Sequence, residues 1–170
     1  PIPNLETMLD SKGFQRSDAI ILASFLGYSV YVGRVVAGYL LDLVWAPALA
    51  CSLLIMPAIS MYLFGGIAPS YLQMVWAIVL LGVAAGVEYD LLAYVVSKYF
   101  GIKSYARIYG TLYAIFGLGA GFGPAVFGLV FKNEGSYDIA LQYSMWAFVI
   151  CSLALLFLGP YRDEKLKSMV

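Results

Sequence analysis

The stretch "LLGVAAGVEYDLLAYVVSKYFG", residues 80–101, is apolar over most of its length, yet Glu88 and Asp90 lie near its middle. Such a run is long enough to cross a hydrocarbon core about 30 Å thick as a helix. A charged side chain at the centre of that core costs at least about 2.5–3.5 kcal/mol, and such groups usually pair or face a polar cavity. The stretch therefore predicts a membrane-spanning helix that carries a functional site.

The rest of the chain has the same apolar character. Of its 170 residues, 62% are hydrophobic and 12% are charged, whereas soluble domains average about 45–50% and about 25%. We therefore expect an all-α, polytopic membrane protein. The chain has no histidine, its two cysteines lie far apart and it has no basic patch. These features predict no metal site, no cofactor and no nucleic-acid partner.

Five apolar segments are each long enough to span a membrane. Their connections are short, so successive spans should be antiparallel neighbours in a helical bundle. Residues 1–16 read as an extracytoplasmic loop and residues 161–170 as a cytoplasmic tail. The predicted spans cover about residues 17–43, 47–66, 70–99, 104–131 and 136–159.

The basic residues predict the orientation of the bundle. Loops on the cytoplasmic side carry an excess of Lys and Arg. Six basic residues share one side, Lys98, Lys103, Arg107, Arg162, Lys165 and Lys167, and three share the other, Lys12, Arg16 and Lys132. We therefore expect a cytoplasmic C-terminus and an outside N-terminus in the plasma (inner) membrane, and an N-terminus outside suggests missing upstream sequence.

Three ionisable residues within the spans share one depth. At 1.5 Å per residue, Arg34 and Asp90 lie about 12 Å, and Glu88 about 15 Å, from the cytoplasmic ends of their helices. Arg34 is expected to pair with a carboxylate, or to share a polar cavity with one. Asp90 continues the small-residue line of Gly82 and Gly86 and should face a neighbouring helix. Glu88, about 200° away around the helix, should face a water-accessible cavity.

The surroundings of Arg34 predict an anion site. Gly27, Tyr31 and Gly38 share its helix face, so the glycines leave room around the guanidinium and Tyr31 adds a polar edge. A guanidinium binds a carboxylate through two hydrogen bonds. Satisfied buried ion pairs are the alternative for the carboxylates, and Arg34 could instead extend its side chain to the interface. The resulting candidates are Arg34, Glu88 and Tyr31 for substrate binding and Glu88 and Asp90 for proton coupling.

Small residues recur at a spacing of four in the fourth predicted span, among them Gly117 and Gly121, and Pro124 follows them. Such a line allows helices to pack closely, and it also allows bending during a transport cycle. The run "GLGAGFG", residues 117–123, has dinucleotide-like glycine spacing. It lies inside an apolar span with no soluble strand before it, so we discount a nucleotide site.

Several motifs resemble one transporter family. "GRVVAGYLLD", residues 33–42, resembles the second copy of the signature of the major facilitator superfamily. "EYDLLAYVVSKYFG", "YARIYGTLYAIFGLGAGFGPAVFGLVF" and "GSYDIALQY", from residue 88 onward, resemble the C-terminal half of its monocarboxylate-transporter-like and oxalate/formate-antiporter-like members. The resemblance implies that the chain holds spans eight to twelve of twelve, without the N-terminal half and span seven.

The resemblance also implies residue roles. Arg34 matches an intramembrane arginine implicated in binding the substrate carboxylate. An aspartate that takes part in proton coupling lies four residues before it in mammalian members, where this chain has Val30. Proton coupling would then fall to Glu88 or Asp90, or the carrier would exchange anions without protons.

Asp42 matches the signature aspartate that latches the cytoplasmic gate in the family. The usual arginine after it is Leu43 here, so Lys98 is the candidate partner. An ordinary aspartate near a helix end is the alternative, although the helix dipole disfavours a carboxylate there.

Together, these features predict a secondary transporter and not an enzyme. It would move a small organic anion, in the first instance a monocarboxylate, by alternating access with a missing N-terminal half in the lipid bilayer. Two alternatives remain open. One is a non-transporting scaffold or receptor-like membrane module, and the other is a major facilitator carrier for drugs or sugars.

Overall fold

A computed structural model describes residues 4–66 and 69–158, and within these ranges the regular structure is entirely helical. A short helix precedes five long ones, and a 3-10 turn follows the last. The elements are α1 (Leu5–Ser11), α2 (Arg16–Leu43), α3 (Ala46–Phe64), α4 (Tyr71–Phe100), α5 (Ile102–Glu134), α6 (Asp138–Leu155) and η2 (Leu156–Leu158).

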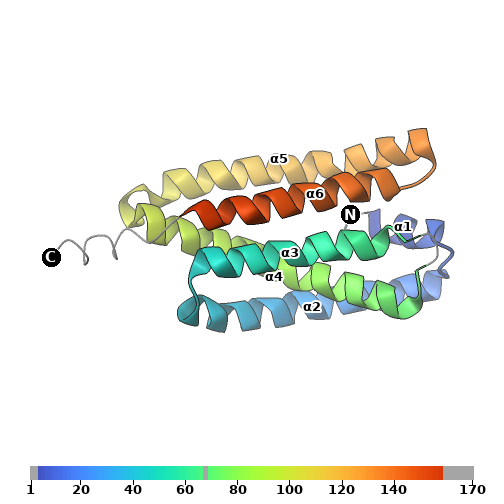
Figure 1. The fold of residues 1–170 in the computed structure, drawn as a ribbon, viewed down its shortest axis with the longest axis horizontal. Coiled ribbons are helices and arrows are strands. Elements are labelled where there is room, and N and C mark those ends of the chain that lie inside the picture. Colours follow the sequence, from blue (N-terminus) through green and yellow to red (C-terminus); the bar gives the residue numbers. More distant parts are fainter. Residues whose placement is uncertain (1–3, 67–68, 159–170) are drawn as a thin grey trace.

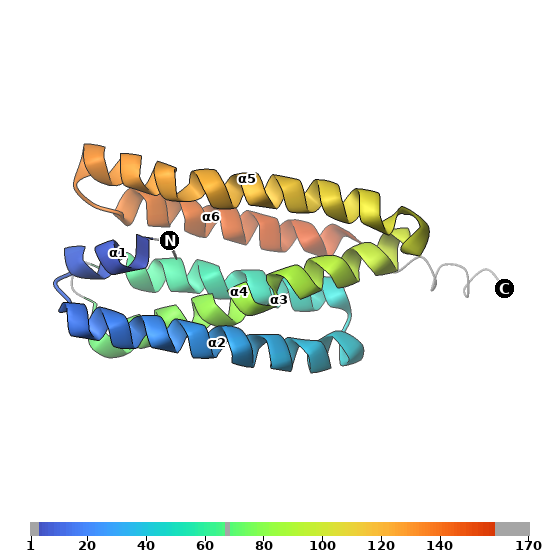
Figure 2. The same cartoon turned by 180° about the vertical axis from the view of Figure 1, so that it is seen from behind.

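The long helices run up and down between two ends of an elongated bundle (Figure 1). One end holds α1, the start of α2, the α3–α4 connection and the α5–α6 connection. The other end holds the α2–α3 and α4–α5 connections and the end of α6. Helix α4 crosses the bundle obliquely, from beside the start of α2 to the start of α5, and the view from behind shows this clearly (Figure 2).

All five predicted spans correspond to helices that are long and apolar enough to cross a membrane. Helix α5 extends beyond the predicted 104–131 at both ends, and α6 is shorter than the predicted 136–159. Gly101 and Gly135 flank it with φ of 71° and 69°, a backbone region that favours glycine, so they set its limits. The helix continues through Pro124, where the sequence allowed a break. Residues 1–3 of the predicted N-terminal loop, the end of the fifth predicted span at residue 159, and the whole predicted tail of residues 161–170 lie outside the described part.

The segment predicted as an N-terminal loop contains a helix. In α1, the apolar residues Leu5, Met8 and Leu9 recur at a spacing of three to four and are 5% exposed or less. One turn of apolar residues on a short helix is enough to bury that face against a bundle. The prediction of an irregular loop missed this pattern because the surrounding residues are polar.

Glycines bring α2 and α4 into close contact. A Cβ atom built on Gly33 would lie 2.6 Å from the Val83 carbonyl oxygen, and one on Gly82 would lie 2.7 Å from Ser29 Cβ. One on Gly86 would collide with the Val30 carbonyl oxygen. Only hydrogen fits at these three positions, so the predicted packing role of the Gly82–Gly86 line is confirmed.

Buried hydroxyls join α3 to its neighbours. Ser60 Oγ donates to the Ala77 carbonyl oxygen of α4 at 2.7 Å. Ser152 Oγ of α6 donates to the Cys51 carbonyl oxygen of α3 at 2.9 Å. Interhelical hydrogen bonds of this kind hold neighbouring helices together in membranes, because no hydrophobic effect drives helices to associate in lipid. Helix α3 is therefore the link between α4 and α6.

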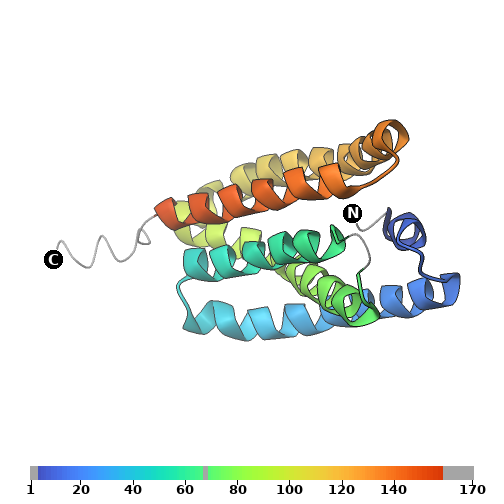
Figure 3. The same ribbon diagram turned by 45° about the vertical axis from the view of Figure 1, so that its right-hand side comes forward.

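Helix α5 stands apart from this packing. Together with α6 it lies along one side of the bundle, away from α2 (Figure 3). Phe127 is its one buried residue. Positions 117 and 121 have no heavy atom within 4 Å of a built Cβ. The glycines of α5 therefore contact no other helix in the part of the chain that the structure describes.

Candidate functional site

Two of the three ionisable residues within the spans, Arg34 and Asp90, meet between α2 and α4. Arg34 Nε lies 3.3 Å from Asp90 Oδ2 and donates to the Gly86 carbonyl oxygen, also at 3.3 Å. The ion pair expected from their shared depth is therefore present, and it selects Asp90 over Glu88 as the partner.

The glycine crossing positions this pair. Gly86 lies against the backbone of Val30, and Arg34 and Asp90 each follow one helical turn further on. The two helices run in the same direction, so one turn along each returns the side chains to the same interface. The local sequence thus places a cation and an anion side by side at one depth.

Within the described residues, the Arg34 guanidinium takes part in this pairing through Nε. The side chain of Arg34 is 54% exposed and that of Asp90 is 51% exposed. Among the described residues, none accepts a hydrogen bond from either Nη atom of Arg34. A guanidinium held through Nε keeps its two terminal amino groups for another acceptor. This geometry suits a carboxylate ligand.

Tyr31 lies one turn before Arg34 on α2 and is 74% exposed. Gly27 and Gly38, on the same helix face, have open space where a Cβ would be. The face around Arg34 is therefore free of neighbouring helices across residues 4–66 and 69–158. Its role in substrate binding stays a prediction.

Glu88 is exposed and has no ion pair or hydrogen bond with any residue that the structure describes. The structure thus separates it from Arg34, while Asp90, two residues on, contacts that arginine. Its predicted roles in substrate binding and proton coupling stay untested.

An aromatic cluster adjoins Glu88 and was missed by the sequence reasoning. The ring of Tyr89 lies 5.0 Å from that of Phe116, edge-on, and 5.7 Å from that of Tyr113. These contacts join α4 to α5 through aromatic pairs, which add to simple apolar packing. The signal was the spacing of Tyr105, Tyr109 and Tyr113, three tyrosines four residues apart on one helix face.

The predicted gating residues lie near the ends of α2 and α4 and in the interior of α5. Asp42 belongs to the last turn of α2, but its side chain lies outside the described part of the structure. Lys98 Nζ lies 5.4 Å above the centre of the Tyr94 ring, a cation–π distance. Gly117 and Gly121 are open, as described above. The gating roles of these residues and of Pro124 stay predictions.

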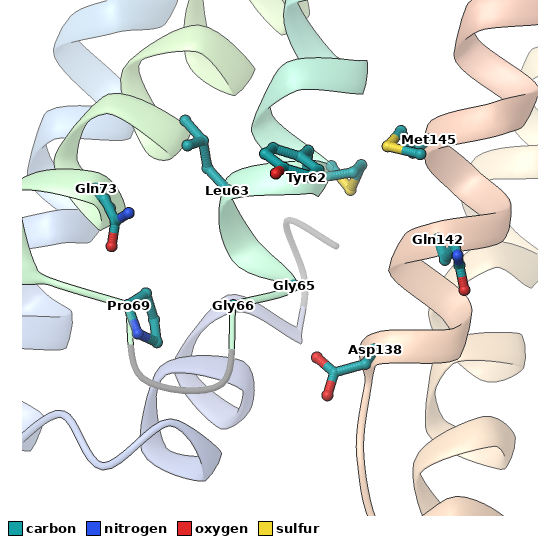
Figure 4. A pocket seen from close by; sticks show the side chains of 10 residues that line it. Tyr62, Leu63, Gly65, Gly66, Pro69, Gln73, Asp138, Gln142 and Met145 are labelled. Atoms are coloured by element: carbon teal, nitrogen blue, oxygen red, sulfur yellow. The ribbon is translucent and has the colours of Figure 1, made fainter.

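A second polar site lies at the opposite end of the bundle, where α3, α4 and α6 end or begin (Figure 4). A cavity of about 590 Å³ is lined there by residues that include Tyr62, Gly66, Asp138 and Met145. Lys12 binds at its edge, with Nζ 2.7 Å from Asp138 Oδ1. From the sequence, Lys12 was used only as one of the basic loop residues that predict orientation. The contacts that bury it come from segments distant in sequence, so no local pattern indicates them.

Comparison with known proteins identifies the family. A family model described as Major Facilitator Superfamily matches residues 1–168. Monocarboxylate transporter 9 of Rattus norvegicus is 30% identical over 139 residues, which are 81% of this chain and 27% of the relative. The protein of the same name from Pongo abelii is 29% identical over 157 residues, 89% of this chain and 30% of the relative.

The chain thus spans less than a third of the length of these curated relatives. No solved structure matches it. The family match covers nearly the whole chain and agrees with the five apolar helices and the glycine-packed interface. The chain belongs to the Major Facilitator Superfamily and is similar to its monocarboxylate transporters.

Proposed function

We propose that the chain is part of a secondary active transporter that moves a small organic anion, in the first instance a monocarboxylate. The observation that carries this proposal is Arg34, a half-exposed guanidinium inside a membrane span that contacts the described residues through Nε. An unshielded charge in a span is costly, and such groups mark substrate and ion pathways. The curated relatives, named monocarboxylate transporter 9, support the same substrate class.

Arg34 would bind the carboxylate of the substrate through its terminal amino groups, with Tyr31 on the same helix face as a further polar contact. Asp90 competes for the same guanidinium because it lies 3.3 Å from Nε. A proton on Asp90 would remove that competition, so proton binding and anion binding would favour each other. Glu88, exposed and without a partner in the described structure, is the second candidate proton carrier.

Translocation would use alternating access, with this bundle moving against an N-terminal half around a central site. The relatives are more than three times as long as the matched region, which leaves room for such a half. The open glycines Gly117 and Gly121, with Pro124, would let α5 bend. Asp42 and Lys98 would latch the cytoplasmic side, and the distribution of Lys and Arg favours a cytoplasmic C-terminus in the plasma membrane.

The test is uptake of a labelled monocarboxylate by the full-length protein in proteoliposomes. Arg34→Ala should lower uptake about tenfold or more, since a hydrogen bond to a charged group contributes about 1.5–3 kcal/mol. Arg107→Ala is the matched control, because Arg107 is an exposed arginine at the start of α5 and should leave uptake unchanged. Equal uptake by the Arg34→Ala and native proteins would overturn the assignment.

A pH gradient across the same liposomes separates the coupling modes. Symport predicts uptake that rises with an inward proton gradient, whereas exchange predicts uptake that depends on anion loaded inside. Uptake of a neutral sugar or a cationic drug in place of the anion would favour the alternative carriers. A folded, correctly inserted protein that moves none of these would favour the scaffold.

A further inference from the structure

Lys12 joins three segments that are distant in sequence. Its side chain is only 12% exposed, and Nζ lies 2.7 Å from Asp138 Oδ1 at the start of α6. The same ammonium donates to the Gly66 carbonyl oxygen, after α3, at 2.9 Å. Figure 4 shows the Asp138 carboxylate pointing toward Gly66 across the edge of the cavity. Lys12 therefore connects the α1–α2 link to the ends of α3 and α6.

Asp138 is held in position for this contact. Ser136 Oγ donates to Asp138 Oδ2 at 3.1 Å and accepts from the Asp138 backbone N–H at 3.0 Å. A carboxylate fixed by its own turn gives up little rotational freedom when it binds an ammonium. The ion pair is thus between a nearly buried cation and an oriented anion, unlike an ordinary surface pair.

The contact keeps α1 over the end of the bundle. Leu5, Met8 and Leu9 of α1 are buried in a cluster that includes Phe127 of α5 and Leu141 of α6. Asn4, the residue before α1, donates its side-chain N–H to the Pro124 carbonyl oxygen of α5 at 3.2 Å. The second half of α5 is therefore attached through Asn4 and through Tyr137, the residue before α6, whose ring centre lies 4.5 Å from that of Phe131.

The first half of α5 has a separate attachment. Tyr113 and Phe116 pack on Tyr89 of α4, before the open glycines at 117 and 121 begin. The helix is thus held at two places, with the open glycines between them. Movement of the second half of α5 would displace Tyr137, directly before the Asp138 that binds Lys12, while the aromatic cluster still holds the first half.

From this arrangement we infer that Lys12 is a positioning residue of the transport cycle. Its clasp, defined as the contacts of Lys12 with Asp138 and Gly66, keeps α1 closed over this end of the bundle and opens when the second half of α5 moves. The part played in transport rests on the proposed function, but the closure itself does not. The nearby pair of Arg16 and Glu6, 3.5 Å apart with side chains 84% and 70% exposed, supplies a control, because it is an exposed ion pair that joins α1 to α2.

Labelling of a cysteine beneath α1 tests the clasp in the full-length protein. Ala140 is 6% exposed and belongs to the buried cluster under α1. Ala140→Cys is introduced in a Cys151→Ser background, because Cys151 is exposed whereas Cys51 is buried. The readout is the rate of reaction with a maleimide that does not cross membranes.

Lys12→Gln should raise the labelling rate about fivefold, since a change of one or two kcal/mol alters such a ratio five- to thirtyfold. Lys12→Arg should stay within about twofold of native because it keeps the charge, and Arg16→Gln should have no effect because exposed pairs contribute little. Equal rates for Lys12→Gln and Arg16→Gln would overturn the inference. If Lys12→Gln does not fold, Ser136→Ala decides, and a native labelling rate for that variant overturns it too.

A transport measurement then distinguishes a positioning role of Lys12 from a general loss of structure that would also weaken anion binding. Lys12→Gln should change the maximal uptake rate while KM for the anion stays within about twofold, because the clasp is remote from Arg34. A matching change in KM would overturn the positioning role. Labelling needs no substrate, so a clear labelling effect in a protein that moves no anion would count against the proposed function and not against the clasp.

Discussion

Glycines do opposite things in the two halves of this bundle. At the crossing of α2 and α4, Gly33, Gly82 and Gly86 have no room for a Cβ. In α5, Gly117 and Gly121 have nothing within 4 Å of that position. The sequence shows small residues at a spacing of four in both places, so spacing alone does not reveal which glycines are packed.

The difference separates two parts of the bundle. Helices α2 and α4, packed through glycines, form what we call the frame, and α5 is the helix that we expect to move. The packed glycines hold Arg34 next to Asp90, because only a close approach of α2 and α4 lets these side chains meet. The open glycines of α5 lie between two attachments, the aromatic rings that pack on Tyr89 of α4 and the contacts of the second half with Tyr137 and Asn4. We therefore expect substitutions in the frame to cost stability, and substitutions in α5 to change motion.

The largest expected effect comes from filling the crossing. Gly86→Val should lower the free energy of unfolding by about 3 kcal/mol, since overpacking a tight site forces backbone shifts. Unfolding of the purified protein in detergent, followed by circular dichroism, gives the change.

Gly121→Val adds the same side chain where the described structure is open. It should change the free energy of unfolding by no more than about 0.5 kcal/mol. If Gly121→Val is as destabilising as Gly86→Val, the comparison fails, and α5 is packed as tightly as the frame in the full protein.

A smaller effect is expected from the ion pair of the frame. Arg34→Gln and Asp90→Asn should each lower the yield of folded protein, because each leaves one charge unpaired within a span. The double variant should be better tolerated than either single one, with a coupling free energy of about 1 kcal/mol. Detergent-stable yield measured by fluorescence-detected size exclusion checks this, and a double variant no better than the singles removes support for the pair.

The smallest effect is expected from one interhelical hydroxyl. Ser60→Ala should cost about 0.6 kcal/mol, the average for hydrogen bonds between membrane helices, because Ser60 is fully buried and donates to Ala77 of α4. Ser24→Ala is the control, since Ser24 is exposed and donates within its own helix to Ile20. Equal melting temperatures for the two variants would show that α3 is not fixed to α4 by this bond.

The spans were predictable because helix length and hydropathy follow directly from composition. Pairing of Arg34 was also predictable, since two unlike charges at one depth stabilise each other. The helix α1 was not, because a seven-residue helix carries only three buried side chains and becomes stable through a buried cluster of residues from distant helices that no local pattern shows.

Less of the candidate site than of the fold could be predicted from the sequence. The sequence left open whether Asp90 or Glu88 pairs with Arg34, and the close packing of Gly82 and Gly86 on α2 explains why Asp90 is the partner. The clasp of Lys12 was missed because its partners lie 54 and 126 residues away. The attachment of α5 through Tyr89 was missed because aromatic residues are common throughout a chain of this composition.

Equilibrium binding of a labelled monocarboxylate to the purified full-length protein tests most directly the claim that Arg34 is the anion receptor. If Arg34 binds the anion, Arg34→Ala should raise Kd about tenfold or more. Arg107→Ala and Gly121→Val should leave Kd within about twofold of native. An Arg34→Ala protein that is folded and binds the anion with native Kd would contradict that claim.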